Sequence, residues 1–199
     1  LAREARSLRD LGGAPRQLVN RTLRVSRETG GRTVAALIRA HRWRVVFARM
    51  KREGRLSIVP GTQQLREGDL VSVVGTPEDI ERVAGVLGEI SDERLELQTG
   101  DMDYRRIFVS NPRVAGYRLC DLNLMEQFGA VVTRVRRGDT LFVPNSETVL
   151  ELGDRVRVVS RKENLDALQA FFGDSYRGSS EIDILSFALG LGLGMLVGL

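Results

Sequence analysis

The sequence predicts an α+β fold of two tandem β-α-β-β-β-α units, followed by the start of a transmembrane helix. Three observations predict it: a motif that recurs 85 positions apart, hairpin and helix signals that recur at the same offset, and an uncharged C-terminal run. The chain has 199 residues, 42% hydrophobic and 28% charged, which is enough for about one or two compact domains.

A ten-residue pattern occurs twice and defines the repeat. Residues 65–74 read LREGDLVSVV and residues 150–159 read LELGDRVRVV, so both follow L-x-x-G-D-x-V-x-V-V. Glycine takes the positive φ of a tight turn without steric cost, and Asp can accept a hydrogen bond from its own backbone. Each Gly-Asp pair therefore predicts a turn that starts a strand, whose alternating valines form its buried face.

Two hairpins are expected before the two motifs, again at matching positions. Each consists of two apolar runs separated by turn residues, Glu53-Gly54 in the first case and Gly138-Asp139 in the second. This arrangement is typical of a β-hairpin. The paired segments are 45–51 with 55–59 and 130–136 with 140–143.

A helix is expected after each valine strand. Thr76 precedes a first-turn proline, and Ser160-x-x-Glu163 has the form of a capping box. Apolar residues keep helical spacing in both segments. Upstream, a lead strand followed by a glycine and a short helix is predicted in each unit. The inward positions are Ile80, Val83, Ala84 and Leu87 with Leu165, Leu168 and Phe172 in the long helices, and Val34, Leu37 and Ile38 with Leu119 and Leu122 in the short ones; the lead strands are 22–26 and 106–110.

These signals place one domain at 19–91 and the other at 103–174, joined by a polar linker at 92–102. A unit of about 70 residues buries only about 60% of its unfolded surface, so the two are expected to pack together.

Both ends of the chain indicate a membrane. Residues 184–199 carry no charge and make about 24 Å of helix, short of the roughly 30 Å of a bilayer core. We therefore expect 182–199 to be a truncated transmembrane helix rather than a buried one, since three glycines at four-residue spacing favour close helix packing in lipid. Residues 1–27 carry seven arginines against two acids, so 1–18 is expected to be a juxtamembrane segment on the cytoplasmic side.

Four arginines on the strands of the second unit are the candidate ligand contacts. Arg134 and Arg136 alternate on one predicted strand, and Arg155 and Arg157 on another. They could line a groove for an anion, although solvent-facing positions of an amphipathic sheet also collect arginines. Because a single unit is too small for a ligand pocket, we expect any ligand to bind between the two units.

The single histidine and the single cysteine limit the chemistry. One cysteine allows no internal disulfide, and His41 with carboxylates offers little for a metal site, so neither a metal nor a cofactor is expected. His41 is expected to cap helix carbonyls rather than bind phosphate. Cys120 is expected to be a small buried hydrophobe rather than a redox sensor.

The element order and the repeated motif resemble the C-terminal domain of regulators of potassium conductance, called RCK-C or TrkA-C. The resemblance covers about 19–91 and 103–174. The junction from Phe171 to the apolar tail is similar to that in the aspartate:alanine exchanger family of bacterial antiporters. This resemblance implies tandem RCK-C domains between groups of membrane helices and transport of an amino acid or dicarboxylate. It also implies a small anionic regulatory ligand such as a cyclic dinucleotide.

We therefore predict a cytoplasmic regulatory module of a multi-pass inner-membrane transporter, related through RCK-C to potassium and cation transport, that contacts the transmembrane domain and forms a homodimer. A purely structural assembly domain is the alternative. No catalytic residues are expected, because paired acids such as Asp101 with Asp103 or Glu67 with Asp69 fall in a linker and a turn. Nucleic-acid binding is disfavoured, because basic residues do not gather with aromatics.

Overall fold

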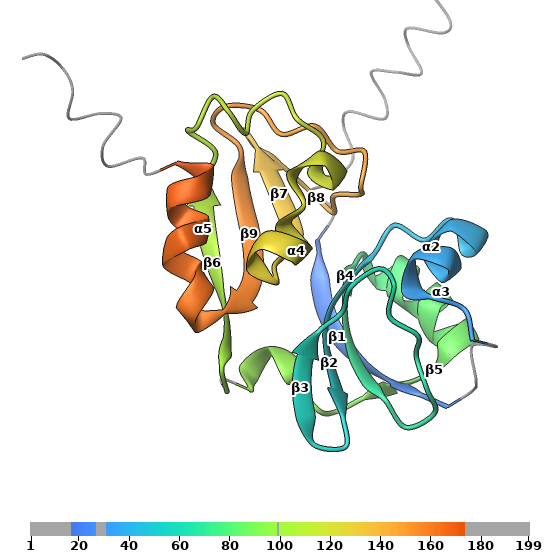
Figure 1. Cartoon of the computed structure of the whole chain (residues 1–199). Coiled ribbons are helices and arrows are strands. Elements are labelled where there is room, and N and C mark those ends of the chain that lie inside the picture. The colour runs from blue at the N-terminus through green and yellow to red at the C-terminus, as the bar shows by residue number, and fades with distance from the viewer. Residues whose placement is uncertain (1–16, 27–30, 99, 174–199) are drawn as a thin grey trace, which may run out of the picture.

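The computed structural model describes residues 17–26, 31–98 and 100–173, and these form a mixed α/β structure with two sheets (Figure 1). The strands of the first sheet are β1 (Val19–Val25), β2 (Val46–Arg52), β3 (Arg55–Ile58), β4 (Leu70–Gly75) and β5 (Gly88–Ser91). Those of the second sheet are β6 (Met102–Phe108), β7 (Val131–Arg137), β8 (Thr140–Phe142) and β9 (Arg155–Arg161).

All neighbouring strands pair antiparallel, in the orders β3-β2-β4-β1-β5 and β6-β9-β7-β8. The helices of the first half (residues 17–98) are α2 (Val34–His41), α3 (Pro77–Leu87) and the 3-10 helix η1 (Leu95–Leu97). Those of the second half (residues 100–173) are η2 (Leu119–Leu122), α4 (Leu124–Phe128), η3 (Lys162–Asn164) and α5 (Leu165–Phe172).

The mixed α/β class and the two hairpins are confirmed. The lead strands begin at Val19 and Met102, several residues before the predicted starts. Strand β5 was not predicted, because four residues after a helix carry no clear alternation; it forms because it pairs along the free edge of β1.

Each sheet has its own apolar core on the side covered by helices. The first core joins Val71 and Val73 of β4 to Ile80 and Val83 of α3. The second joins valines of β9 to the buried face of α5. The predicted inward positions of both long helices are confirmed, and in Figure 1 α5 lies on the outer side of the second sheet and α2 and α3 on that of the first.

The Gly-Asp turns form the same contacts in both halves. Gly68 and Gly153 have φ values of 86° and 88°, as predicted for tight turns. Asp69 is 2% exposed and accepts two hydrogen bonds from Arg52, at 2.7 and 2.6 Å. Asp154 is equally buried and accepts two from Arg137, at 2.9 and 2.8 Å. Each carboxylate also accepts a bond from the backbone N–H three residues before it.

The faces that the helices leave uncovered meet along a surface that we call the seam. Strand β2 contacts β7, and both carry a β-bulge, at Ala48 and at Thr133. A bulge turns two consecutive residues to one face of the sheet. The residues of the seam are Asn20, Ala48, Arg49, Ser72 and Val74 from the first sheet, Glu96 from η1, and Tyr104, Thr133, Arg134, Arg157 and Val159 from the second sheet.

The predicted polar linker is a packed part of the structure. Helix η1 lies against β2 and β4, and Leu95 is fully buried. The N–H of Leu95 donates to the hydroxyl of Thr22, and its carbonyl accepts from Arg49 at 3.0 Å. The buried side chain of Leu95 and these two hydrogen bonds explain how a polar stretch is fixed.

The predicted capping box at Ser160 is wrong. The Ser160 hydroxyl donates to the carbonyl of Phe128 at 2.8 Å, and the chain first makes the 3-10 turn η3, so that Asn164 precedes α5. The cap at Thr76 is confirmed, since its hydroxyl accepts from the N–H of Asp79 at 3.2 Å.

Replacing Thr76 by Ala is expected to lower the free energy of unfolding by about 1 kcal/mol, because the N–H groups of the first turn of α3 lose their acceptor. Urea denaturation followed by circular dichroism measures this change. The control is Thr62→Ala at an exposed turn, expected to change stability by less than about 0.5 kcal/mol. Equal effects of the two changes would contradict a capping role.

Among residues 17–26, 31–98 and 100–173, no helix is long and apolar enough to cross a membrane. The predicted membrane segment 182–199 and residues 1–16 of the juxtamembrane segment lie outside the described residues.

Candidate functional site: a cleft between the two halves

A cleft of about 1040 Å³ lies between the two halves of the chain. Small-molecule sites are typically about 300 to 1,000 Å³, with apolar walls and a few polar groups. The first half contributes residues of α2 and β2, and the second contributes η2, α4, the start of β7 and the segment after β8.

The wall from the first half is held by a capped helix and a buried tryptophan. The Thr33 hydroxyl accepts from the third N–H of α2 at 3.2 Å, which fixes the start of the helix. Trp43 is 6% exposed and stacks on His41, with ring centroids 4.8 Å apart. The predicted capping role of His41 is not seen: the N–H of Arg42, in the left-handed conformation, donates to the last carbonyls of α2.

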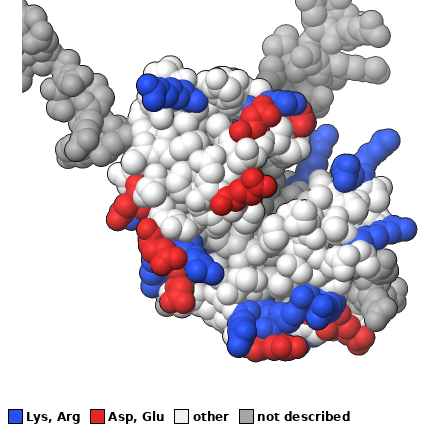
Figure 2. Space-filling model, in the orientation of Figure 1, with Lys and Arg blue, Asp and Glu red and all other residues white. Residues whose placement is uncertain are grey.

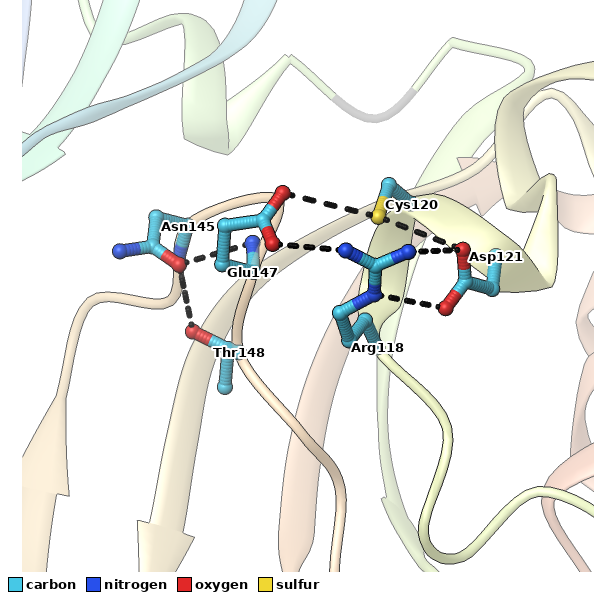
Figure 3. Close-up of polar contacts among 6 residues, drawn as sticks. All are labelled: Arg118, Cys120, Asp121, Asn145, Glu147 and Thr148. Atoms are coloured by element: carbon cyan, nitrogen blue, oxygen red, sulfur yellow. Dashed lines mark hydrogen bonds and ion pairs between the residues drawn. The ribbon is translucent and has the colours of Figure 1, made fainter.

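The opposite wall is built on a polar loop around Asn145 (Figure 3). Asn145 accepts from the N–H of Glu147 at 3.0 Å and from the hydroxyl of Thr148 at 3.1 Å. Arg118 joins this loop to η2, since it donates two hydrogen bonds to Asp121 and one to Glu147 at 2.9 Å. The bonds from Arg118 hold the pKa of Asp121 below its ordinary value.

Cys120 is exposed beside this network, so the prediction that it is buried is wrong. Its neighbour Leu119 turns inward, and a 3-10 helix then directs Cys120 outward. Partial desolvation, followed by the nearby charges of Asp121 and Glu147, keeps the pKa of the thiol above its ordinary value, although Arg118 opposes this. A thiol with a raised pKa is a weak nucleophile at neutral pH.

The two walls of the cleft carry opposite charges. Arg39 and Arg44 line it from the first half, and Glu126 and Glu147 line it from the second. Figure 2 shows basic side chains over the α2 side and acidic ones over the side of α4. The cleft therefore offers both a cationic and an anionic wall to a ligand.

The four arginines predicted as ligand contacts lie on one face of the second sheet, the face of the seam. The register pairs Arg134 with Arg157 and Arg136 with Arg155. Arg134 and Arg157 line a small cavity within the seam, and the Cζ atom of Arg157 lies 3.7 Å from the centroid of the Tyr104 ring. Arg136 and Arg155 are exposed, and the Cζ atom of Arg155 lies 4.2 Å from the centroid of the Phe108 ring. None of the four is part of the lining of the large cleft.

Arg49 is a seam residue that was not among the contacts predicted from the sequence. It is 3% exposed, and burial first of all lowers its pKa, with the positive charge of Arg157 adding to the effect. The available signal was its position, because Arg49 precedes Arg134 by the same 85 residues as the motifs. In the described part of the chain, no group of three His, Cys, Asp or Glu side chains could hold a metal ion.

The second half of the chain is similar to a known domain family. The family model described as the TrkA-C domain matches residues 104–173, from β6 to the end of α5. The resemblance to this domain is confirmed for that part of the chain.

Curated relatives match nearly the whole chain and are named as transporters. The chain is 51% identical over 198 residues to an uncharacterized transporter of Geobacter sulfurreducens, covering 98% of this chain and 36% of the relative. It is 48% identical over 182 residues to an uncharacterized transporter of Symbiobacterium thermophilum, covering 91% and 34%. The chain thus spans about a third of the length of these relatives.

Solved structures of RCK domains are also similar. One is the RCK C domain of the potassium transport protein KtrA in complex with cyclic di-AMP, with 18% identity, a TM-score of 0.33 and coverage of 47% of this chain and 92% of that one. Another is the RCK domain of GsuK, with 11% identity, a TM-score of 0.36 and coverage of 78% and 63%.

Proposed function

We propose that this chain is the regulatory part of a membrane transporter, in which a small ligand binds in the cleft and changes the arrangement of the two halves. The observation that carries this proposal is the cleft, because residues of both halves line it. A ligand held between two bodies can favour one of their arrangements over another. A tenfold preference, about 1.4 kcal/mol, shifts a balanced equilibrium clearly.

The TrkA-C match and the names of the relatives support the assignment to a transporter. Within the proposal, 19–91 and 103–174 are two copies of one RCK-C-like domain, joined by 92–102. The equal strand orders β3-β2-β4-β1 and β8-β7-β9-β6 and the repeated Asp–Arg pairs support this reading. Superposition of experimental coordinates for the two halves would test it.

The chain regulates and does not catalyse; it lies on the cytoplasmic side of a multi-pass inner-membrane protein and forms a homodimer. Residues 1–18 are a juxtamembrane segment and residues 182–199 are the first part of a transmembrane helix. The transported solute is an amino acid or dicarboxylate, as in aspartate:alanine exchangers. Solute uptake into vesicles containing the full-length protein tests the transport activity separately from ligand binding.

The regulatory ligand is proposed to be a small molecule with an anionic group, which Arg39 and Arg44 would attract. Calorimetry of the chain with cyclic di-AMP, ATP and dicarboxylates is expected to show binding of one of these classes. Met125→Trp should narrow the cleft and weaken binding at least tenfold, because Met125 is half-buried in its wall. The matched control is Val86→Trp on α3, exposed and outside the cleft, which should leave affinity unchanged.

Equal weakening by both tryptophans would contradict the cleft as the binding site. A loss confined to the double variant Arg136→Met, Arg155→Met would instead place the ligand on the predicted arginines. Absence of binding by every ligand class would favour the alternative function, a structural domain that assembles the transporter.

A further inference from the structure

The seam contains a small cavity that is lined by residues with unpaired polar atoms. Its volume is about 20 Å³. In the part of the chain that the structure describes, five buried side-chain atoms have no hydrogen-bond partner in the protein, and the residues that carry all five line this cavity. Buried polar atoms are rarely unpaired, so their occurrence in residues around one cavity points to a shared partner. The atoms are Asn20 Oδ1, Arg49 Nε, Ser72 Oγ, Glu96 Oε2 and Arg134 Nε.

These atoms come from three parts of the fold. Asn20, Arg49 and Ser72 lie on adjacent strands of the first sheet, Glu96 lies on η1, and Arg134 lies on β7 of the second sheet. A partner that bonds to all of them would therefore join both sheets and the segment that connects them.

Arg49 lines the cavity, and its guanidinium group is held in place by a hydrogen bond. Its Nη1 donates to the carbonyl of Leu95 at 3.0 Å, and Leu95 is fully buried. The β-bulges bring Arg49 and Arg134 to the seam at equivalent positions of β2 and β7. Burial lowers the pKa of both guanidinium groups, so a new hydrogen-bond acceptor here would relieve part of their desolvation.

The size of the cavity limits the ligand to one small species. A cavity needs a volume of at least about 10–15 Å³ to hold a water molecule. At about 20 Å³ the seam cavity accommodates one water and excludes a nucleotide or a dicarboxylate.

The donors and acceptors then decide between a water molecule and a halide ion. Two Nε–H groups donate, two oxygens accept, and the Ser72 hydroxyl can do either. A water molecule accepts two bonds and donates two, which is the complement of this set. A halide only accepts; it would leave the oxygens of Asn20 and Glu96 unpaired and would lie beside the Glu96 carboxylate.

We propose that the seam cavity is a binding site for one ordered water molecule, which accepts from Arg49 and Arg134 and donates to Asn20 and Glu96. A water-mediated polar contact then links the two sheets at the seam. This inference stands without the proposed function, since it rests only on the seam.

A crystal structure of the chain at about 1.5 Å, with a parallel bromide soak, tests the site directly. The expected result is one density peak within hydrogen-bond distance of at least three of the four named side chains, with no anomalous signal for bromide. A bromide peak in the cavity would overturn the proposal in favour of an anion site. A cavity without density would overturn it as well.

Matched variants test the same site in solution, where oxygen-17 relaxation dispersion counts long-lived internal waters. Arg134→Met should remove one such water, whereas Arg136→Met, two residues along the same strand and outside the cavity, should remove none. An unchanged count in both variants would contradict the proposal. Glu96→Met, with Glu89→Met as its exposed control, makes the same test without altering β7, should Arg134→Met fail to fold.

Discussion

Replacing Arg137 by Met is expected to lower the free energy of unfolding by about 2 to 3 kcal/mol. Its partner Asp154 has a side chain with no exposed surface, so the change leaves a buried carboxylate without its counter-ion. Breaking a buried ion pair typically costs about 3 to 5 kcal/mol. The value here is reduced because the Arg137 side chain is 37% exposed and partly screened by water.

The control for this prediction is Arg136→Met, which removes the same charge from the neighbouring position. Arg136 is exposed; it donates to the carbonyl of Gly138 and forms a 3.9 Å ion pair with the fully exposed Asp139. Its loss should therefore change stability by less than about 0.5 kcal/mol. Denaturant unfolding at neutral pH measures both variants. If the two losses were alike, the buried pair would not be a source of stability.

The effect of Arg137→Met should depend on pH. Burial alone would raise the pKa of Asp154, but the bonds from Arg137 and from the backbone hold it below its ordinary value. A depressed carboxyl pKa contributes stability above the pKa of the unfolded chain, about 3.9, and this contribution is lost as pH falls through the folded value. The difference between wild type and variant should therefore shrink below about pH 4. A constant difference down to pH 2 would contradict this explanation.

Replacing Gly88 by Ala is expected to destabilise the chain by about 2 to 4 kcal/mol. Gly88 follows α3 with φ of 149°, and an added Cβ would lie 2.2 Å from the carbonyl oxygen of Arg24. The alanine must therefore adopt a strained backbone or push β5 away from β1. Gly173 follows α5 in the same way, at φ of 111°, so Gly173→Ala is expected to have a similar effect.

Gly85 is the matched control for this change. It lies on the exposed side of α3, and an added Cβ would meet nothing within 4 Å. Alanine is favoured over glycine inside a helix by about 0.5–1 kcal/mol, so Gly85→Ala should raise stability. In thermal unfolding, Gly85→Ala should then raise the melting temperature and Gly88→Ala should lower it. A destabilising Gly85→Ala, or a neutral Gly88→Ala, would refute the argument.

The sequence predicted those elements whose signals are local. Paired valines, turn glycines and the Thr76 cap each act within a few residues, and β4, β9, both hairpins and α3 follow from them. The ion pair between Arg52 and Asp69 could not be predicted from spacing alone, because it needs the register of the hairpin against β4. The repeat held a hint, since Arg137 follows Arg52 at the same offset.

The sequence predicted the location of the candidate site better than it predicted the residues that line the site. Packing of two small halves predicted a cleft between them, and a cleft is present. Strict alternation, however, could not reveal the bulges that turn Ala48 with Arg49, and Thr133 with Arg134, toward the seam. Cys120 shows the same limit, because an apolar neighbourhood in sequence predicted burial for a side chain that the 3-10 helix η2 exposes.

The buried Leu95 determines where the chain could be divided into fragments. The connection between the two sheets is part of the first half's fold, since Leu95 bonds through its backbone to both Thr22 and Arg49. A first fragment that ended at Ser91 would lose those bonds and uncover the parts of β2 and β4 that η1 contacts. A fragment that continues to Gln98 keeps them, so a proteolytic cut after η1 would separate the halves with less damage than one before it.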